Sequence, residues 1–225
     1  MSQNDHRLSQ MRGPEGGPYV VWGVGTSRTM RVHWMLHELN CPYTTQKITS
    51  RSGQTQTSAY VALNPSQKIP ALQCADWVLT ESAAIVNFLA TCHGSDCELS
   101  PPTQPHLRAL YDEWCFFSMM ELDANTLYVI RKHLDLSALY GEASAAVNAA
   151  QQGFKKQANA AAVRLSKTGP YVMGNTFSAA DILFSTCLSG ALRRQIPLPQ
   201  SLLDYLTLTT KREAYRSALV ANQAV

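Results

Sequence analysis

The sequence lacks several features that mark common classes of protein. No apolar run approaches the roughly 20 residues that span a bilayer, and the polar, Gly/Pro-rich segment 1–18 has no apolar core of the kind found in secretion signals. No run of Lys and Arg accompanies the formal net charge of +3, which argues against a nucleic-acid-binding surface. We therefore expect a disordered tail over residues 1–18 and a cytoplasmic protein that binds neither membrane nor nucleic acid.

The cysteines give no sign of a disulfide framework or a metal centre. There are six of them in 225 residues, of which 45% are hydrophobic, so a large apolar core is available and reduced thiols are expected. Cys92 and Cys97, with His93 beside them, make at most half of a zinc site, and no second Cys/His pair follows at zinc spacing. We predict that the protein holds no metal.

The pattern of apolar residues divides the chain in two. The first part alternates between strands and helices, in the order βαβ, an irregular segment, ββ and α. The Pro/Ser-rich stretch 95–105 is the best candidate linker, and the signal beyond it is almost wholly helical. We predict an α/β domain over residues 19–94, a linker over 95–105 and an all-helical domain over 106–225.

Two short motifs in the first part indicate a binding site. Pro70 interrupts a strand pattern after Ile69. A cis Ile69–Pro70 bond would leave the main chain of Ile69 able to pair with a peptide. The local sequence alone favours an ordinary trans proline on an edge strand, because cis is the minority form of X-Pro bonds. Ser82 is placed to begin a helix, whose N–H groups can hold a carboxylate, and Glu81 offers a partner for an ammonium group. The simpler reading of this pair is a helix cap.

In combination these motifs resemble the cytosolic glutathione transferases, in the bacterial branch that uses a serine hydroxyl. The resemblance rests on "NPSQKIPAL" (64–72), "ESAAI" (81–85), "CPY" (41–43) and "GPYVMGNTFSAADILFSTCL" (169–188), and it extends over roughly residues 19–216. It implies a thioredoxin-like domain followed by a helical bundle. It also implies a cis Pro70, glutathione as co-substrate and a homodimer.

The resemblance places the chemistry at the turn between the first strand and the first helix. A hydroxyl that donates to the glutathione sulfur at a helix N-terminus favours the thiolate. Ser27, assisted by Arg28, is our preferred donor, and Thr26 is the alternative. This turn contains no cysteine, which argues against thiol-reductase chemistry.

The resemblance also suggests residues that bind the two substrates. Lys68 or Gln67 would meet the glycyl carboxylate of glutathione, Ile69 and Pro70 its cysteinyl part, and Glu81 with Ser82 its γ-glutamyl head. The electrophile would contact the first long helix of the second domain, through residues chosen from its aromatic and methionine side chains, namely Trp114, Phe117, Met120 and Tyr128.

The sequence therefore predicts a glutathione transferase that adds the thiolate to a small, mostly apolar electrophile. The alternatives are a glutathione-binding module without turnover and a glutathione-dependent peroxidase or isomerase. Separately, Ser178 and Asp181 have the spacing of a capping box, and the apolar helix that follows them is predicted to be buried.

Overall fold

The computed structural model describes residues 18–224, so the predicted disordered tail lies outside the described residues except for Pro18. The chain forms two compact units. The first unit combines the described residues up to Ser100 with those from Arg212 onward, and the second comprises Pro101–Lys211. The boundary between Ser100 and Pro101 falls inside the predicted linker.

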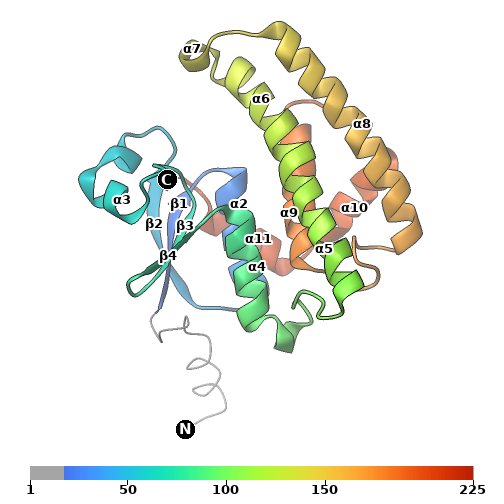
Figure 1. The fold of residues 1–225 in the computed structure, drawn as a ribbon, viewed down its shortest axis with the longest axis horizontal. Helices are drawn as coiled ribbons and strands as arrows, with labels where there is room; N and C mark the ends of the chain where they lie inside the picture. The colour runs from blue at the N-terminus through green and yellow to red at the C-terminus, as the bar shows by residue number, and fades with distance from the viewer. Residues whose placement is uncertain (1–17, 225) are drawn as a thin grey trace. The chain divides into compact units, whose positions relative to one another are not determined.

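The first unit contains a mixed four-stranded sheet with helices on both sides (Figure 1). The strand order is β2-β1-β3-β4, where β1 pairs parallel to β2 and antiparallel to β3, and β3 pairs antiparallel to β4. In chain order, its elements are β1 (Tyr19–Val24), α2 (Ser27–Glu38), β2 (Tyr43–Thr49), η1 (Gln54–Gln56), α3 (Ser58–Leu63), β3 (Ala71–Cys74), β4 (Trp77–Thr80), α4 (Ser82–His93), η2 (Ser95–Cys97) and α11 (Glu213–Ala221). This is the predicted βαβ-ββα order of a thioredoxin-like domain, with α11 added to it.

Helix α2 is packed on most sides, against β1, α4 and α11. Residues Met30 to Leu36 are buried, and the helix ends before Asn40, which adopts a positive φ of 50°, a conformation that asparagine tolerates better than most residues. Helices α2 and α4 lie on one side of the sheet and α3 on the other (Figure 1). The sheet is therefore covered on both faces, and the open ends of its strands are available for a site.

The second unit is built from helices around a buried central one. Its elements are α5 (Pro105–Phe117), η3 (Ser118–Leu127), α6 (Tyr128–Ile130), η4 (Arg131–Asp135), α7 (Ser137–Tyr140), α8 (Ser144–Thr168), α9 (Ala179–Leu192) and α10 (Gln200–Thr210). Almost every side chain of α9 is buried, as its uniformly apolar sequence predicts. The capping box of Ser178 and Asp181 at its N-terminus is confirmed.

The structure differs from the sequence-based prediction in two places. The sequence pattern over residues 106–133 predicts one long helix, but the first α-helix, α5, ends at Phe117. Beyond it, η3 and η4 are π-helical. The last helix, α11, belongs with the first unit, whereas the predicted helical domain runs to residue 225. The fold class itself, a thioredoxin-like domain with a helical bundle, is confirmed.

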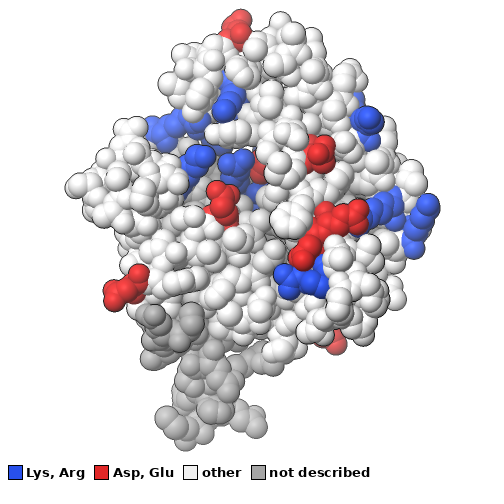
Figure 2. Space-filling model, in the orientation of Figure 1, with Lys and Arg blue, Asp and Glu red and all other residues white. Residues whose placement is uncertain are grey.

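The remaining global features set few constraints on function. No helix within residues 18–224 combines the length and apolarity that crossing a bilayer requires. No disulfide joins the six cysteines, all of which lie among the described residues. On the face drawn in Figure 2, basic and acidic side chains form small groups, some of them touching one another, on a mostly uncharged surface.

Candidate active site

The strand register brings the three predicted segments to one end of the sheet. Trp22 pairs with Ala71, and Ala71 pairs with Thr80. The residues just beyond these positions therefore lie at the same edge. They are the turn after β1, the Ile69–Pro70 bond that precedes β3, and the Glu81–Ser82 pair that follows β4. Three stretches, the first and last of which span from Gly25 to Ser82, 57 residues apart along the chain, converge for this reason.

The Ile69–Pro70 segment is fixed by close packing and by hydrogen bonds to its neighbour. The peptide bond is cis, as the family resemblance implies. A Cβ atom added to Gly23 would lie 2.6 Å from Ile69 Cβ, and Gly23 has a φ of +117°, so only glycine permits this approach of β1 to Ile69. The carbonyl oxygen of Lys68 accepts hydrogen bonds from Tyr60 Oη (2.7 Å) and Asn64 Nδ2 (2.8 Å).

Gln67 and Lys68 are both exposed. Gln67 stands where the pattern of the resembled family has glycine, and its φ is +55°, in the left-handed region that favours glycine. The side chain at this position is thus held on the surface next to the segment that precedes the cis bond.

The turn after β1 is organised by a reciprocal cap. Thr26 is the N-cap of α2, and its hydroxyl oxygen accepts from the main-chain N–H of Thr29 (3.0 Å), while Thr29 Oγ1 accepts from the N–H of Thr26 (3.0 Å). Ser27 and Arg28 are the first two helical residues, and both are half-buried. Thr26, Ser27 and Arg28 therefore all lie at the N-terminus of α2, close to the positive end of its dipole.

The Glu81–Ser82 pair combines a strained backbone with a buried hydroxyl. Glu81 is exposed and has φ 64° and ψ 110°, an unfavourable conformation for a residue with a side chain, of the kind that clusters at binding sites. Ser82 begins α4 and is buried. Its Oγ accepts from Arg31 Nη1 at 3.1 Å, and Arg31 is only 1% exposed. A guanidinium therefore lies directly behind the α4 N-terminus, which strengthens the attraction of this corner for a carboxylate.

A neutral histidine connects the end of β1 to the back of α2. His33 Nε2 lies 3.2 Å from the carbonyl oxygen of Gly23, which can only accept, so this nitrogen carries the proton and donates. Tyr43 Oη then donates to His33 Nδ1 (2.9 Å) and accepts from His37 Nε2 (3.2 Å). Burial lowers the pKa of His33 from 6.5 to about 4. His33 is thus an uncharged support of the Gly23–Ile69 contact.

The predicted electrophile-binding residues have different environments within the second unit. Trp114 is buried and packs against Phe184, with ring centroids 5.3 Å apart, so its environment favours a role in the core. Phe117 and Tyr128 are half-buried. Met120 is 53% exposed and is the most exposed of these four.

Sequence reasoning missed three residues that shape this site. Arg31 donates a hydrogen bond to Ser82, and His33 donates one to the carbonyl oxygen of Gly23. Asn222, at the end of α11, hydrogen-bonds to the turn after β1. Arg31 and His33 are polar residues within the apolar face of a helix, which is a usable signal. Asn222 offered none. Within residues 18–224, no group of three or more His, Cys, Asp or Glu side chains is arranged to hold a metal ion.

Known proteins resemble parts of this sequence. Residues 27–92 match the glutathione S-transferase N-terminal domain family. A glutathione S-transferase-like protein, tpcF, of Aspergillus fumigatus is 35% identical over 106 residues, which are 46% of each chain. A similar protein, gedE, of Aspergillus terreus is 32% identical over 102 residues, or 44% of each chain. The matched part thus spans just under half the length of these curated relatives.

The similarity to solved structures covers nearly the whole chain. The theta class glutathione S-transferase of Xanthomonas axonopodis pv. citri, solved with glutathione bound, superposes with a TM-score of 0.78 at 24% identity, over 93% of this chain and 100% of that one. A glutathione transferase homologue from Lodderomyces elongisporus, with two glutathione molecules per subunit, gives 0.80 at 18% identity, over 92% and 99%. The protein has the glutathione transferase fold. The match to the N-terminal domain family is confined to residues 27–92, and the similarity over the rest of the chain is one of fold.

Proposed function

We propose that the protein is a glutathione transferase, which binds glutathione at the end of the sheet, ionises its thiol and adds the thiolate to a small, mostly apolar electrophile. The observation that carries this proposal is the convergence of three segments at one sheet edge. They supply a hydroxyl-bearing helix N-terminus, a main chain turned by a cis bond, and a helix mouth backed by a buried guanidinium.

Each segment suits a different part of the tripeptide. The α4 N-terminus, with Ser82 and Arg31 behind it, suits the α-carboxylate of the γ-glutamyl residue, and the Glu81 carboxylate suits its ammonium group. The main chain at Ile69 can pair with the cysteinyl residue. Lys68 and Gln67, exposed beside this segment, are our choices for the glycyl carboxylate.

The thiol would then lie near the α2 N-terminus, where its ionised form is favoured. An ordinary thiol, with a pKa near about 8.5, is only a few per cent thiolate at neutral pH, and each unit of depression corresponds to about 1.4 kcal/mol of preferential binding of the anion. The α2 dipole, a hydroxyl donor and the Arg28 charge act in the same direction. The hydroxyl serves as a donor to sulfur and not as a base.

The cap determines how the donor can be tested. Because Thr26 Oγ1 accepts from Thr29, Thr26→Ala removes the helix cap as well as a hydroxyl, at a cost of about 1 kcal/mol in stability. Ser27→Ala removes a hydroxyl and leaves the cap in place. We keep Ser27 as the preferred donor and expect Ser27→Ala to lower turnover about tenfold at neutral pH, with little change in glutathione affinity.

The decisive experiment is a spectral titration of the protein–glutathione complex. Thiolate absorbance that develops below pH 7.5 in the wild type, and at higher pH in Ser27→Ala, supports the proposed chemistry. Glutathione that binds with an unshifted thiol pKa would identify a binding module without turnover. A shift that is lost only in Thr26→Ala would assign the donor to Thr26.

The expectations of a homodimer and a cytoplasmic location belong to the same proposal. They rest on the family resemblance. Sedimentation of the purified protein measures the first, and imaging of a tagged chain in its own cells measures the second.

A further inference from the structure

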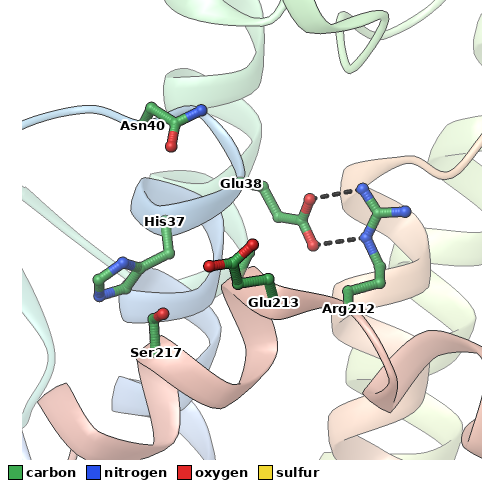
Figure 3. Close-up of a pocket in the computed structure, with 7 residues that line it drawn as sticks. His37, Glu38, Asn40, Arg212, Glu213 and Ser217 are labelled. Carbon is green, nitrogen blue, oxygen red and sulfur yellow. Dashed lines mark hydrogen bonds and ion pairs between the residues drawn. The ribbon is translucent and has the colours of Figure 1, made fainter.

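Helix α11 runs along α2 within the first unit and contacts it at both ends and in the middle. At the C-terminal end of α2, Arg212 holds Glu38 through two hydrogen bonds of 2.6 Å each (Figure 3). Halfway along, the rings of Trp34 and Tyr215 meet edge to face, with centroids 4.8 Å apart. The two helices are therefore antiparallel, and the residue that ends α11 arrives at the N-terminal turn of α2.

That residue is Asn222, and its polar atoms are hydrogen-bonded to this turn. Its Nδ2 donates to the carbonyl oxygen of Thr26 (3.2 Å), and its Oδ1 accepts from Thr29 Oγ1 (2.6 Å) and from the N–H of Gly25 (3.1 Å). The same N–H of Gly25 also lies 2.9 Å from the main-chain oxygen of Asn222. One side chain thus binds the chain on both sides of Ser27.

The turn needs support from outside because glycine leaves its backbone conformationally free. Gly25 has a φ of +81°, and glycine has no side chain to restrict it. The capping box fixes Thr26 relative to Thr29, but the entry from β1 into the turn depends on Gly25. A hydrogen-bond donor acts on a developing charge only when it is held in the right direction within fractions of an ångström.

We infer that Asn222 is a positioning residue for thiol ionisation: it holds the Gly25–Thr29 turn so that the hydroxyl and the helix N-terminus point at the glutathione sulfur. This inference rests on the proposed function. It extends that function to an element far along the chain, which the three segments of the candidate site do not include.

The contacts of Asn222 distinguish positioning from ordinary helix capping. The end of α11 is closed by a main-chain bond, from the N–H of Asn222 to the oxygen of Ala218 at 2.9 Å, and an alanine at position 222 would keep it. The side-chain bonds described above go to residues 25–29 instead. Asn222→Ala therefore releases the turn and leaves the α11 end intact.

The test compares Asn222→Ala, Asn222→Asp and the neighbouring control Gln223→Ala in the full chain. Gln223 is exposed and stands next to Asn222. The thiol pKa of bound glutathione is read from thiolate absorbance, and kcat and KM are measured with a standard chromogenic electrophile. For Asn222→Ala we expect the thiol pKa to rise by about one unit and kcat at neutral pH to fall about tenfold, with less than a threefold change in KM for glutathione.

Asn222→Asp separates positioning from stability. An aspartate keeps both acceptor contacts and adds a negative charge at the α2 N-terminus, which stabilises a helix. The same charge disfavours a nearby thiolate. It also lies against the carbonyl oxygen of Thr26, to which Asn222 Nδ2 donates in the wild type. We expect Asn222→Asp to melt no lower than Asn222→Ala but to raise the thiol pKa at least as far. Should Asn222→Ala fold poorly, Asn222→Asp carries the test.

Three results would overturn the inference. The first is a thiol pKa in Asn222→Ala that equals those of the wild type and Gln223→Ala. The second is an effect confined to KM or to the melting temperature. The third is an aspartate variant that restores wild-type ionisation, which would indicate a purely structural tie. The first result, with a clear thiolate in the wild type, leaves the proposed function standing, whereas a wild type that forms no thiolate overturns both.

Discussion

Removal of the Asp181 carboxylate should be among the most destabilising single changes in the second unit. The side chain is fully buried and accepts four hydrogen bonds. Oδ1 accepts from the N–H of Val172 (2.9 Å) and from Tyr205 Oη (2.8 Å), and Oδ2 accepts from the N–H and the Oγ of Ser178 (2.8 Å each). Asp181 thus joins the loop before α9, the start of α9, and α10 at one point.

The magnitude follows from the donors that Asp181→Ala would leave without an acceptor. Two of them are main-chain N–H groups, which cannot rotate toward another partner, and each buried donor left unsatisfied costs about 1–3 kcal/mol. Burial raises the pKa of the Asp181 carboxyl, against the pull of its hydrogen-bond donors, so relief of the buried charge offsets part of the loss. We expect a net destabilisation of about 3 kcal/mol, or about 6–12 °C in Tm for a chain of this size.

Denaturant unfolding followed by tryptophan fluorescence measures this change. Ser178→Ala should cost only about 1 kcal/mol, the usual value of an N-cap, because the Ser178 N–H keeps its bond to Asp181. Asp204→Ala, at an exposed position on α10, is the control and should stay within about 0.5 kcal/mol of the wild type. If Asp181→Ala lies within 1 kcal/mol of Asp204→Ala, the accounting of buried donors is wrong.

Three further predictions concern the first unit. The pKa of His33 should be near 4 in an NMR titration, below the ordinary value of 6.5. Because the unfolded chain takes up this proton at a higher pH than the folded one, the contribution of His33 to the unfolding free energy is complete above pH 6.5. It is lost as the pH falls toward 4, by about 3 kcal/mol. A His33 pKa near 6.5 would contradict the buried neutral assignment. Gly23→Ala should destabilise the fold and weaken glutathione binding in calorimetry, because its Cβ would collide with Ile69. Gly53 also has a positive φ, of +82°, but open space around it, so Gly53→Ala should lose only the backbone contribution of about 1 kcal/mol; equal losses would refute the role of the collision. Arg212→Ala should lower Tm by several degrees, because it leaves the buried Glu38 carboxylate without its bidentate partner, and an unchanged Tm would show that the ion pair does not hold α11.

The part of the site that depends on local chemistry could be predicted from the sequence. The alternation of apolar runs defines the strands and helices of the first unit, and the Ser178–Asp181 spacing defines the cap of α9 in the second unit. Both patterns reflect contacts only a few residues apart. The family resemblance supplied the cis bond before Pro70, whereas the local sequence alone favoured a trans bond.

The remainder depends on contacts between distant segments. Asn222 meets Gly25 across almost 200 residues, and the Arg31–Ser82 bond forms only once α2 and α4 are packed side by side. The π-helical turns of η3 and η4 also escaped prediction, because an apolar face with the period of an α-helix accommodates a locally wider turn without a marked change in pattern. The exposed Glu81 gave no sign of its strained backbone for a similar reason, since strain is set by the strands on either side of it.

The discontinuity of the first unit has a consequence for how the chain emerges from the ribosome. The surface of α2 that α11 covers is synthesised early, but 174 residues separate the end of α2 at Glu38 from the start of α11 at Glu213. At about 5–20 residues per second, the nascent α2 waits roughly 9–35 s for α11. During this interval Trp34 lacks its contact with Tyr215 and the Glu38 carboxylate lacks its ion pair with Arg212. The nascent chain therefore exposes a surface of α2 that a chaperone could recognise.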